Sequence, residues 1–284
     1  MSTGSESSIV IRDIKTGEEM REVEKLQQLV WGVPDLDVVP ASQLVASQVA
    51  GGVLLGAFQA DTMAGFVYGF AGYEKGKAIH HSHMLAIRPE FRNFNLGRKL
   101  KLAQRECVLN KGINEMTWTF DPLQSLNAHI NFYKLGVVSK RYLVNFYGED
   151  APSFLHRNGT DRLWVTWLLN SKRVIKRVVG GEPGTTQDDA IPLVKVRSDG
   201  SPELNDLENG LLALKCSVEI PGDINSLENE DRELAFEWRL ATRSAFTKAI
   251  KADFLVEEFY RNANGRKPSG KYILSRGKGI EDIL

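Results

Sequence analysis

The sequence has little cysteine, with only Cys107 and Cys216 among its 284 residues. Two cysteines this far apart cannot form a disulfide framework, and such sparse use is typical of proteins from a reducing compartment. We therefore expect a cytoplasmic protein. Residues 1–8 are rich in serine and glycine and lack the basic and apolar segments of a signal peptide. They are predicted to form a short disordered tail.

The sequence also lacks an excess of charge of either sign, because 36 Lys and Arg residues balance 36 Asp and Glu residues. Proteins that bind nucleic acid or an anionic membrane through their overall field usually carry a positive excess. The composition therefore favours neither nucleic acid nor a membrane surface as a partner.

Long apolar runs of the kind that cross a membrane are missing as well. Residues 38–60 contain no charged residue, but they include proline, glycine, serine and glutamine. A membrane-spanning helix needs about 20 predominantly apolar residues, and such polar and helix-breaking residues are costly in a bilayer. The segment is interpreted as a buried helix followed by a buried strand.

Two nucleotide-binding signatures are absent from the sequence. It has no Gly-Lys-Ser/Thr of the Walker type and no triple-glycine fingerprint of the Rossmann type. An unrelated nucleotide-binding enzyme is therefore a weak alternative, which competition between ATP and coenzyme A would test.

The hydrophobic pattern predicts alternating strands and helices in the first half of the chain. Thr16 and Glu19 have capping-box spacing, which predicts a helix that starts there and runs to Trp31. The other predicted elements are strands at 9–14, 53–59, 63–73, 78–87, 115–120 and 137–147, and helices at 43–50, 96–111 and 123–135.

The second half predicts a separate, smaller unit. A strand is expected at 162–169, and a Gly- and Thr-rich segment follows. Strands are then expected at 193–196, 216–220, 254–260 and 272–275, with a long amphipathic helix whose apolar stripe covers 234–250. We therefore predict a domain at 9–170, a linker at 171–191 and an α+β domain at 192–284. Trp238 and Phe246 in the stripe are expected to be buried.

The junction between the strand at 78–87 and the helix at 96–111 carries the strongest chemical signal. Amides at a helix start and the helix dipole favour an anion. Gly97 lets a phosphate approach the backbone without a Cβ in the way, and Arg92 and Arg98 can donate charge-assisted hydrogen bonds. The residues predict a pyrophosphate cradle. The alternative is an ordinary strand-to-helix turn with solvated arginines.

This junction resembles the acyl-CoA signature of the GNAT acyltransferase superfamily. That pattern is Arg or Gln, two residues, Gly, one residue, then Gly or Ala. Arg92 and Gly97 match it, whereas Asn95 replaces the first glycine. Asn tolerates positive φ better than most residues. The predicted element order over 9–147 also matches, so the resemblance covers about half of the chain.

The resemblance implies an α/β fold with a GNAT-like mixed, mostly antiparallel sheet flanked by helices, followed by the smaller α+β unit. It implies that acetyl-CoA or another acyl-CoA is the co-substrate, that no metal is needed, and that a small-molecule amine is the acceptor. Succinyl donors and amino acid acceptors occur among long two-part members, and a homodimer is also expected. An inactive CoA-binding or interaction protein is the alternative, favoured by Asn95 and Phe132.

The same resemblance implies which residues hold the cofactor. The pantetheine arm would bind the backbone of the strand before the turn, and the pyrophosphate would bind the turn. A helix ending in Lys134-Leu135-Gly136 would add two asparagines. The cofactor-binding residues expected are Met84, Leu85, Ala86, Ile87, Arg92, Asn93, Phe94, Asn95, Leu96, Gly97, Arg98, Asn127 and Asn131.

Histidines in the strand at 78–87 are candidates for proton transfer. Regular alternation places His81 and His83 on one face with Leu85 and Ile87. A histidine can accept a proton from an amine nucleophile, and several family members have their general base near the position of His81. A metal site is disfavoured because no Cys or acidic ligand is nearby.

Tyr133 is the third catalytic candidate. The family places a tyrosine near the CoA thiol as general acid, but Phe132 occupies that position here and Tyr133 follows it. The catalytic residues expected are His81, His83 and Tyr133.

Overall fold

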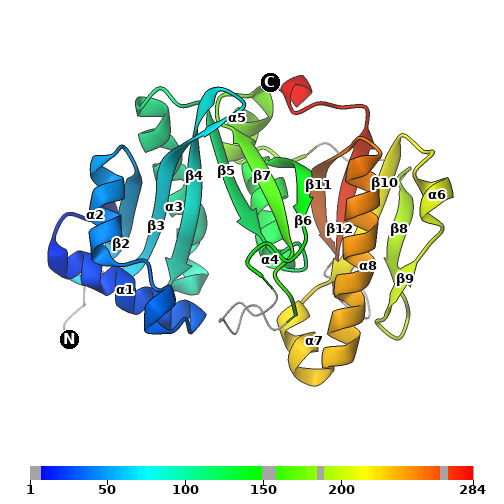
Figure 1. Ribbon diagram of the computed structural model, residues 1–284, viewed down its shortest axis with the longest axis horizontal. Coiled ribbons are helices and arrows are strands. Elements are labelled where there is room, and N and C mark those ends of the chain that lie inside the picture. The colour runs from blue at the N-terminus through cyan, green and yellow to red at the C-terminus, as the bar shows by residue number, and fades with distance from the viewer. Residues whose placement is uncertain (1–7, 149–157, 184–188, 263–267, 284) are drawn as a thin grey trace, which may run out of the picture. The chain divides into compact units, whose positions relative to one another are not determined.

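The computed structural model describes residues 8–148, 158–183, 189–262 and 268–283 (Figure 1). The predicted tail therefore lies outside the described residues except for Ser8. The chain divides into two compact units between Thr117 and Trp118. None of the helices in the described ranges is long and apolar enough to cross a bilayer.

The first unit contains the elements that the pattern over 9–120 predicts, together with two short 3-10 helices. They are β1 (Val10–Asp13), α1 (Gly17–Trp31), a 3-10 helix (Asp35–Asp37), α2 (Ala41–Val49), β2 (Val53–Gln59), β3 (Thr62–Glu74), β4 (Lys77–Ile87), a 3-10 helix (Pro89–Phe94), α3 (Leu96–Asn110) and the first half of β5 (Glu115–Phe120). The capping box is present, because Glu19 N donates to Thr16 Oγ1 at 3.1 Å and Thr16 N donates to Glu19 Oε2 at 3.2 Å.

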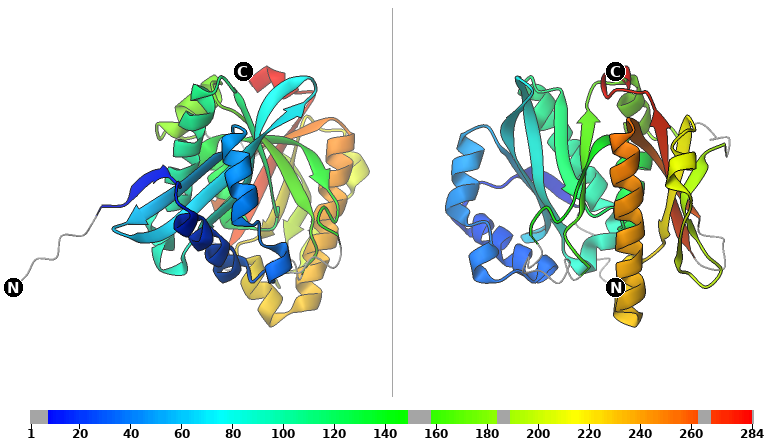
Figure 2. Two further views of the ribbon diagram at one scale, coloured as in Figure 1. Left: turned by 60° about the vertical axis from the view of Figure 1, so that its left-hand side comes forward. Right: turned by 45° about the vertical axis from the view of Figure 1, so that its right-hand side comes forward.

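The sheet of this unit is mixed and mostly antiparallel. Strands β1 to β4 pair antiparallel in sequence order, and β5 joins β4 in parallel. Helices α1 and α2 contact one face of the sheet, and α3 contacts the other (Figure 2). Leu26, Leu44 and Phe66 lie in the core beneath α1 and α2. The predicted α/β class, with helices on both faces of a mostly antiparallel sheet, is confirmed.

The second unit begins inside β5. It contains α4 (Ser125–Ala128), a π-helix (His129–Leu135), β6 (Val138–Leu143), β7 (Arg162–Leu168), α5 (Lys172–Val178), β8 (Ile191–Val196), β9 (Pro202–Leu204), α6 (Leu207–Gly210), β10 (Lys215–Pro221), α7 (Ile224–Glu230), α8 (Arg232–Lys251), β11 (Phe254–Asn262), β12 (Ser269–Arg276) and a 3-10 helix (Glu281–Ile283). The strand order is β7-β6-β11-β12-β10-β8-β9, and β8 pairs with β10 in parallel.

Two predicted elements of this unit differ from what forms. The helix predicted at 123–135 is a short α-helix followed by the π-helix, which Gly136 ends at φ 75°. The strand predicted at 137–147 stops at Leu143, because a turn with Asn145 at φ 47° follows.

The two aromatic residues of the α8 stripe are buried, as predicted. Phe246 stacks on Tyr142 of β6 with ring centroids 5.5 Å apart and meets Tyr272 of β12 edge-on at 5.2 Å. Trp238 Nε1 donates to Gly200 O at 3.0 Å. Both side chains are therefore fully buried within the second unit.

The linker predicted at 171–191 includes the helix α5. Residues before and after it contact each other inside the second unit. Ser139 of β6 pairs with Val256 of β11, and Arg239 of α8 forms an ion pair with Asp121. A division into domains at 171–191 remains a prediction.

Candidate active site

The turn between β4 and α3 is closed by a left-handed residue. The chain leaves β4 at Ile87, passes through the 3-10 helix at Pro89–Phe94 and enters α3 at Leu96. Asn95 joins the two helices at φ 57° and ψ 25°, and its side chain does not cap α3. Asn is one of the few residue types other than Gly that adopts this conformation readily. The amides in the first turn of α3 therefore donate no hydrogen bond to the side chain of Asn95.

Gly97 is the second residue of α3, and the fold does not require a glycine there. A Cβ at this position would meet only Leu85 Cδ2, at 3.7 Å, which is an ordinary van der Waals distance. Glycine in a helix is less favourable than alanine by about 0.5–1 kcal/mol. The missing side chain instead leaves space beside the first amides of the helix. An anion can approach the backbone in that space.

Two arginines flank this helix start. Arg92 is exposed on the 3-10 helix, and Arg98 is partly buried on α3. A third arginine, Arg88, binds within the fold, because its Nε donates to Met63 O at 2.7 Å and its guanidinium pairs with Glu22 at 3.3 Å. Phe94 is exposed, Leu96 is buried, and the side chain of Asn93 lies outside the described part of the structure.

Strand β4 carries a bulge at His83. Tyr68 of β3 pairs with Met84 and Gly69 pairs with Ser82, so no residue of β3 lies opposite His83. A bulge removes the backbone groups of its extra residue from the regular ladder and reverses the alternation of side chains beyond it. These backbone groups lie on the strand that leads into the turn.

Because of the bulge, the prediction of which β4 side chains share a face is wrong. His81 and His83 do not share a face with Leu85 and Ile87. Met84 packs with the core beneath α1 and α2, on the side of the histidines, whereas Leu85 lies near Gly97 of α3. The one extra residue moves every later side chain to the opposite face.

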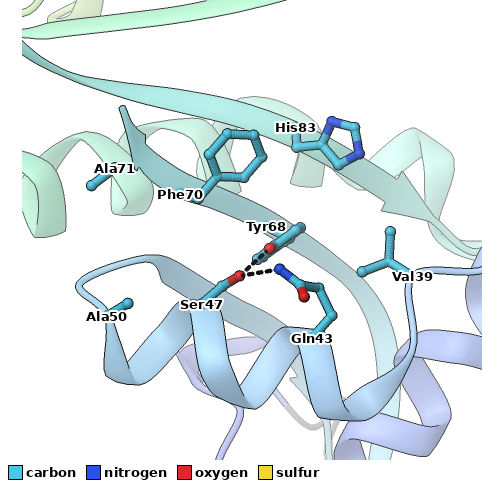
Figure 3. Close-up of a pocket in the computed structure, with 8 residues that line it drawn as sticks. All are labelled: Val39, Gln43, Ser47, Ala50, Tyr68, Phe70, Ala71 and His83. Atoms are coloured by element: carbon cyan, nitrogen blue, oxygen red, sulfur yellow. Dashed lines mark hydrogen bonds between the residues drawn. The ribbon is translucent and has the colours of Figure 1, made fainter. Parts of the chain in front are cut away.

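A pocket of about 390 Å³ lies between α2 and the strands β3 and β4 (Figure 3). It is lined by Val39, Gln43, Ser47, Ala50, Tyr68, Phe70, Ala71 and His83. The Tyr68 hydroxyl donates to Ser47 Oγ at 2.6 Å, and Gln43 Nε2 donates to the same oxygen at 3.2 Å. The size and mixed lining are those of a small-molecule site.

Both predicted catalytic histidines lie at this face. The ring of His81 is 5.5 Å from that of Phe70, and His81 Nδ1 is 3.0 Å from Thr117 Oγ1 of β5. Burial, followed by the charge of His83, lowers the pKa of His81 to about 4. The protein around His83 lowers its pKa as well, although this residue stays exposed at the pocket. Both imidazoles are therefore neutral at pH 7 and able to accept a proton.

A buried polar chain lies on the other face of β4, where sequence analysis missed it. Lys101 Nζ donates to Ser82 Oγ at 2.7 Å, Ser82 Oγ donates to Gln104 Oε1 at 2.8 Å, and Gln104 Nε2 is 3.2 Å from His80 Nε2. Lys101 and Gln104 lie three residues apart on the apolar face of α3, beside Leu100. The sequence signal for this chain was the presence of polar residues at two positions of α3 that its periodicity places in the core.

Tyr133, Asn127 and Asn131 belong to the second unit. Asn127 is exposed at α4, whereas Asn131 is buried in the π-helix. Tyr133 stacks on His129 with ring centroids 4.7 Å apart. Burial and the neighbouring Glu182 raise the pKa of Tyr133, so its hydroxyl keeps its proton at neutral pH.

Metal ligands are not grouped in the described parts of the chain. No three or more His, Cys, Asp or Glu side chains come close enough there to hold a metal ion. His80 and His81 point to opposite faces of β4, since His80 meets Gln104 of α3 and His81 meets Phe70.

Comparison with known proteins finds similarity in structure but not in sequence. No protein-family model matches this chain, and no curated protein is detectably similar to it. Solved structures that resemble it include acetyltransferases, two of which are described as members of the GNAT family.

Three of these structures illustrate the extent of the similarity. A GNAT-family acetyltransferase from Elizabethkingia anophelis with acetyl-CoA bound is 16% identical at a TM-score of 0.44, over 56% of this chain and 97% of its own. The ribosomal-protein-S18-alanine N-acetyltransferase from Escherichia coli is 12% identical at 0.45, over 57% and 94%. Aminoglycoside 6'-acetyltransferase type Ii is 17% identical at 0.43, over 56% and 97%.

Proposed function

We propose that this protein is an acyl-CoA-dependent N-acyltransferase whose cofactor binds where β4 passes into α3. The observation that carries the proposal is Gly97. It occupies a position where alanine would fit and would favour the helix, next to helix amides and between Arg92 and Arg98. The packing of the fold gives no reason for a glycine at this position. A glycine is expected where a bulky anion approaches the backbone.

The strand before the turn supplies the second half of this proposed site. The backbone of residues 84–87 would bind the pantetheine arm, and the bulge at His83 leaves backbone groups outside the pairing with β3. An amide held in this way can donate to the oxygen on which negative charge develops during acyl transfer. When bound, the thioester supplies the activated acyl group.

The pocket beside the bulge would hold the amine. His83 lines it, and its neutral imidazole can accept the proton that the amine must lose. His81 lies behind Phe70 and would assist. Overall, a bond forms between the amine nitrogen and the acyl carbon, the bond from that carbon to sulfur breaks, and CoA leaves with a proton.

Two variants of Gly97 test the cofactor site. Gly97→Asp places a negative charge at the proposed pyrophosphate, and calorimetry should show CoA affinity falling at least about tenfold, or roughly 1.4 kcal/mol. An acidic residue in the first turn favours the helix, so this loss should occur in a folded protein. Gly97→Ala should raise the melting temperature slightly and weaken CoA binding less.

Ser42→Asp is the matched control, because Ser42 is exposed at the second position of α2, just as Gly97 is the second residue of α3. It should leave CoA affinity unchanged. A folded Gly97→Asp variant that binds CoA like the wild type would contradict the proposed site.

An inactive CoA-binding protein remains the second candidate, because Asn95 and Phe132 depart from the family pattern. A steady-state assay of CoA release with an amine present separates the two. Release that depends on the amine supports an enzyme, and binding without release supports the alternative.

A further inference from the structure

Aromatic rings form one wall of the pocket. Tyr68 and Phe70 of β3 and His83 of β4 face the cavity together (Figure 3). Their ring centroids lie 6.1 Å apart for Tyr68 and Phe70, 5.8 Å for Phe70 and His83, and 6.2 Å for Tyr68 and His83. Aromatic rings prefer offset or edge-to-face partners at about 4.5–7 Å. The wall can therefore receive a further ring or an aliphatic chain.

The opposite wall adds polar atoms that already bind one another. Ser47 Oγ accepts hydrogen bonds from Tyr68 and from Gln43. Val39 and Ala50 complete this side with apolar surface. The polar groups of α2 therefore hold the shape of the pocket and do not present a charge.

No Asp, Glu, Lys or Arg is among the described residues that line the pocket. A carboxylate or a second ammonium on the bound molecule would gain no ionic partner among these residues. Burying an unpaired charge is strongly unfavourable. The cavity, at about 390 Å³, is also near the lower end of the range for small-molecule sites, about 300–1,000 Å³.

We infer that this pocket selects an amine whose remaining part is small, uncharged and apolar, such as an arylalkylamine, and that it discriminates against free amino acids. The inference rests on the proposed function, because it assigns the acceptor of the same reaction. The apolar part would lie against Phe70 and Tyr68, with the nitrogen toward His83. The pocket therefore disfavours amino acids, which are among the acceptors that the family resemblance implies.

Three probes that share one ring test the inference with the full chain and saturating acetyl-CoA. They are 2-phenylethylamine, phenylalaninamide and phenylalanine, so that the amide adds bulk without charge and the acid adds a carboxylate. We expect kcat/KM for CoA release to fall at least about a hundredfold from the uncharged amine to phenylalanine, with the amide well above the acid. Equal use of the amide and the acid, a preference for phenylalanine, or use of none of the three would overturn the inference.

Charge and shape of the pocket can then be changed one at a time. Gln43→Arg adds a guanidinium that can bind the carboxylate of phenylalanine. The ratio of kcat/KM for 2-phenylethylamine to kcat/KM for phenylalanine should therefore fall at least about tenfold. Ser42→Arg, one residue earlier and not part of the lining, is the control and should leave the preference unchanged. Phe70→Ala should lower kcat/KM for 2-phenylethylamine at least about tenfold without changing CoA affinity. An unchanged preference in Gln43→Arg together with unchanged turnover in Phe70→Ala would contradict the assignment.

Calorimetry of CoA binding separates this inference from the proposed function. A wild-type protein that does not bind CoA refutes the acyltransferase itself. A protein that binds CoA and prefers phenylalanine refutes only the assignment of the acceptor.

Discussion

Lys101 Nζ donates a hydrogen bond to Ser82 Oγ at 2.7 Å, inside the layer between α3 and β4. The Ser82 hydroxyl donates a hydrogen bond to Gln104 Oε1, and Gln104 Nε2 lies 3.2 Å from His80 Nε2. His80 Nδ1 has no hydrogen-bond partner among the described residues. These hydrogen bonds fix the strand immediately before the bulge at His83, so a buried lysine helps to hold the proposed site in shape.

Because Lys101 is buried, the free energy of unfolding should depend on pH in the alkaline range. Burial lowers the pKa of Lys101 from 10.5 to about 7. Between these values the unfolded chain binds a proton that the folded protein does not, so the free energy of unfolding should rise as pH rises from about 7 toward 10.5. Below pH 7 Lys101 is charged in both states, so its burial then costs the most stability. Lys101→Met should remove this slope in urea midpoints measured across the window.

Lys99→Met, at an exposed position of the same helix, controls for the loss of one lysine. Parallel curves for the wild type and Lys101→Met would show that the buried lysine has no part in the pH dependence.

His83 should matter more to the rate than His81. His83 lines the pocket, whereas His81 is next to Thr117. We expect His83→Ala to lower kcat about a hundredfold and His81→Ala to lower it less, with CoA affinity unchanged in both. The base must be neutral to act, and the pKa of His83 is lowered from 6.5. The rate at saturating amine should therefore persist at pH 6.5 and fall only in more acidic solution.

Wild-type turnover in both histidine variants would assign proton transfer to water. A larger loss in His81→Ala would instead make His81 the base.

Local signals made part of the fold predictable from the sequence. The capping box at Thr16 and Glu19 depends on residues three positions apart, so spacing alone reveals it. The same holds for the turn at Asn95, because few residue types adopt its backbone conformation.

Features set by pairing between distant segments were not predictable. The bulge at His83 exists only in the register between β3 and β4, and it reversed the predicted faces of β4. A lysine is usually found at the surface, and although the periodicity of α3 hints that Lys101 is buried, its hydrogen bond to Ser82 follows only from the packing of α3 on β4. The pocket likewise joins Gln43 of α2 to Phe70 of β3, which no local spacing connects.

Asn95 should respond to substitution through its backbone alone. Its φ of 57° is unfavourable for a residue with an ordinary Cβ, so Asn95→Ala should lower the free energy of unfolding by about 1 kcal/mol. Asn95→Gly removes the steric cost and should change stability by less than Asn95→Ala does. Equal loss in both, measured by urea unfolding, would indicate that the Asn side chain and not the backbone is important.

The ion pair between Arg239 and Asp121 should be the most sensitive contact of the second unit. Arg239 is 1% exposed, and its guanidinium donates to both carboxylate oxygens, at 2.9 and 2.6 Å, while Nε donates to Asn158 O at 2.7 Å. Arg239→Met leaves the carboxylate without this partner, so the free energy of unfolding should fall by about 3–5 kcal/mol.

Removing both charges of this pair separates the cost of a buried, unpaired carboxylate from the cost of lost packing. The double variant Arg239→Met, Asp121→Leu leaves no unpaired carboxylate and should recover a substantial part of the loss, because apolar pairs often replace buried ion pairs with little cost. Lys140→Met removes a more exposed ion pair of the same unit, with Asp253 at 2.7 Å, and should cost less than about 1 kcal/mol. If the double variant is no more stable than Arg239→Met in urea unfolding, the loss came from packing around the arginine and not from the unpaired carboxylate.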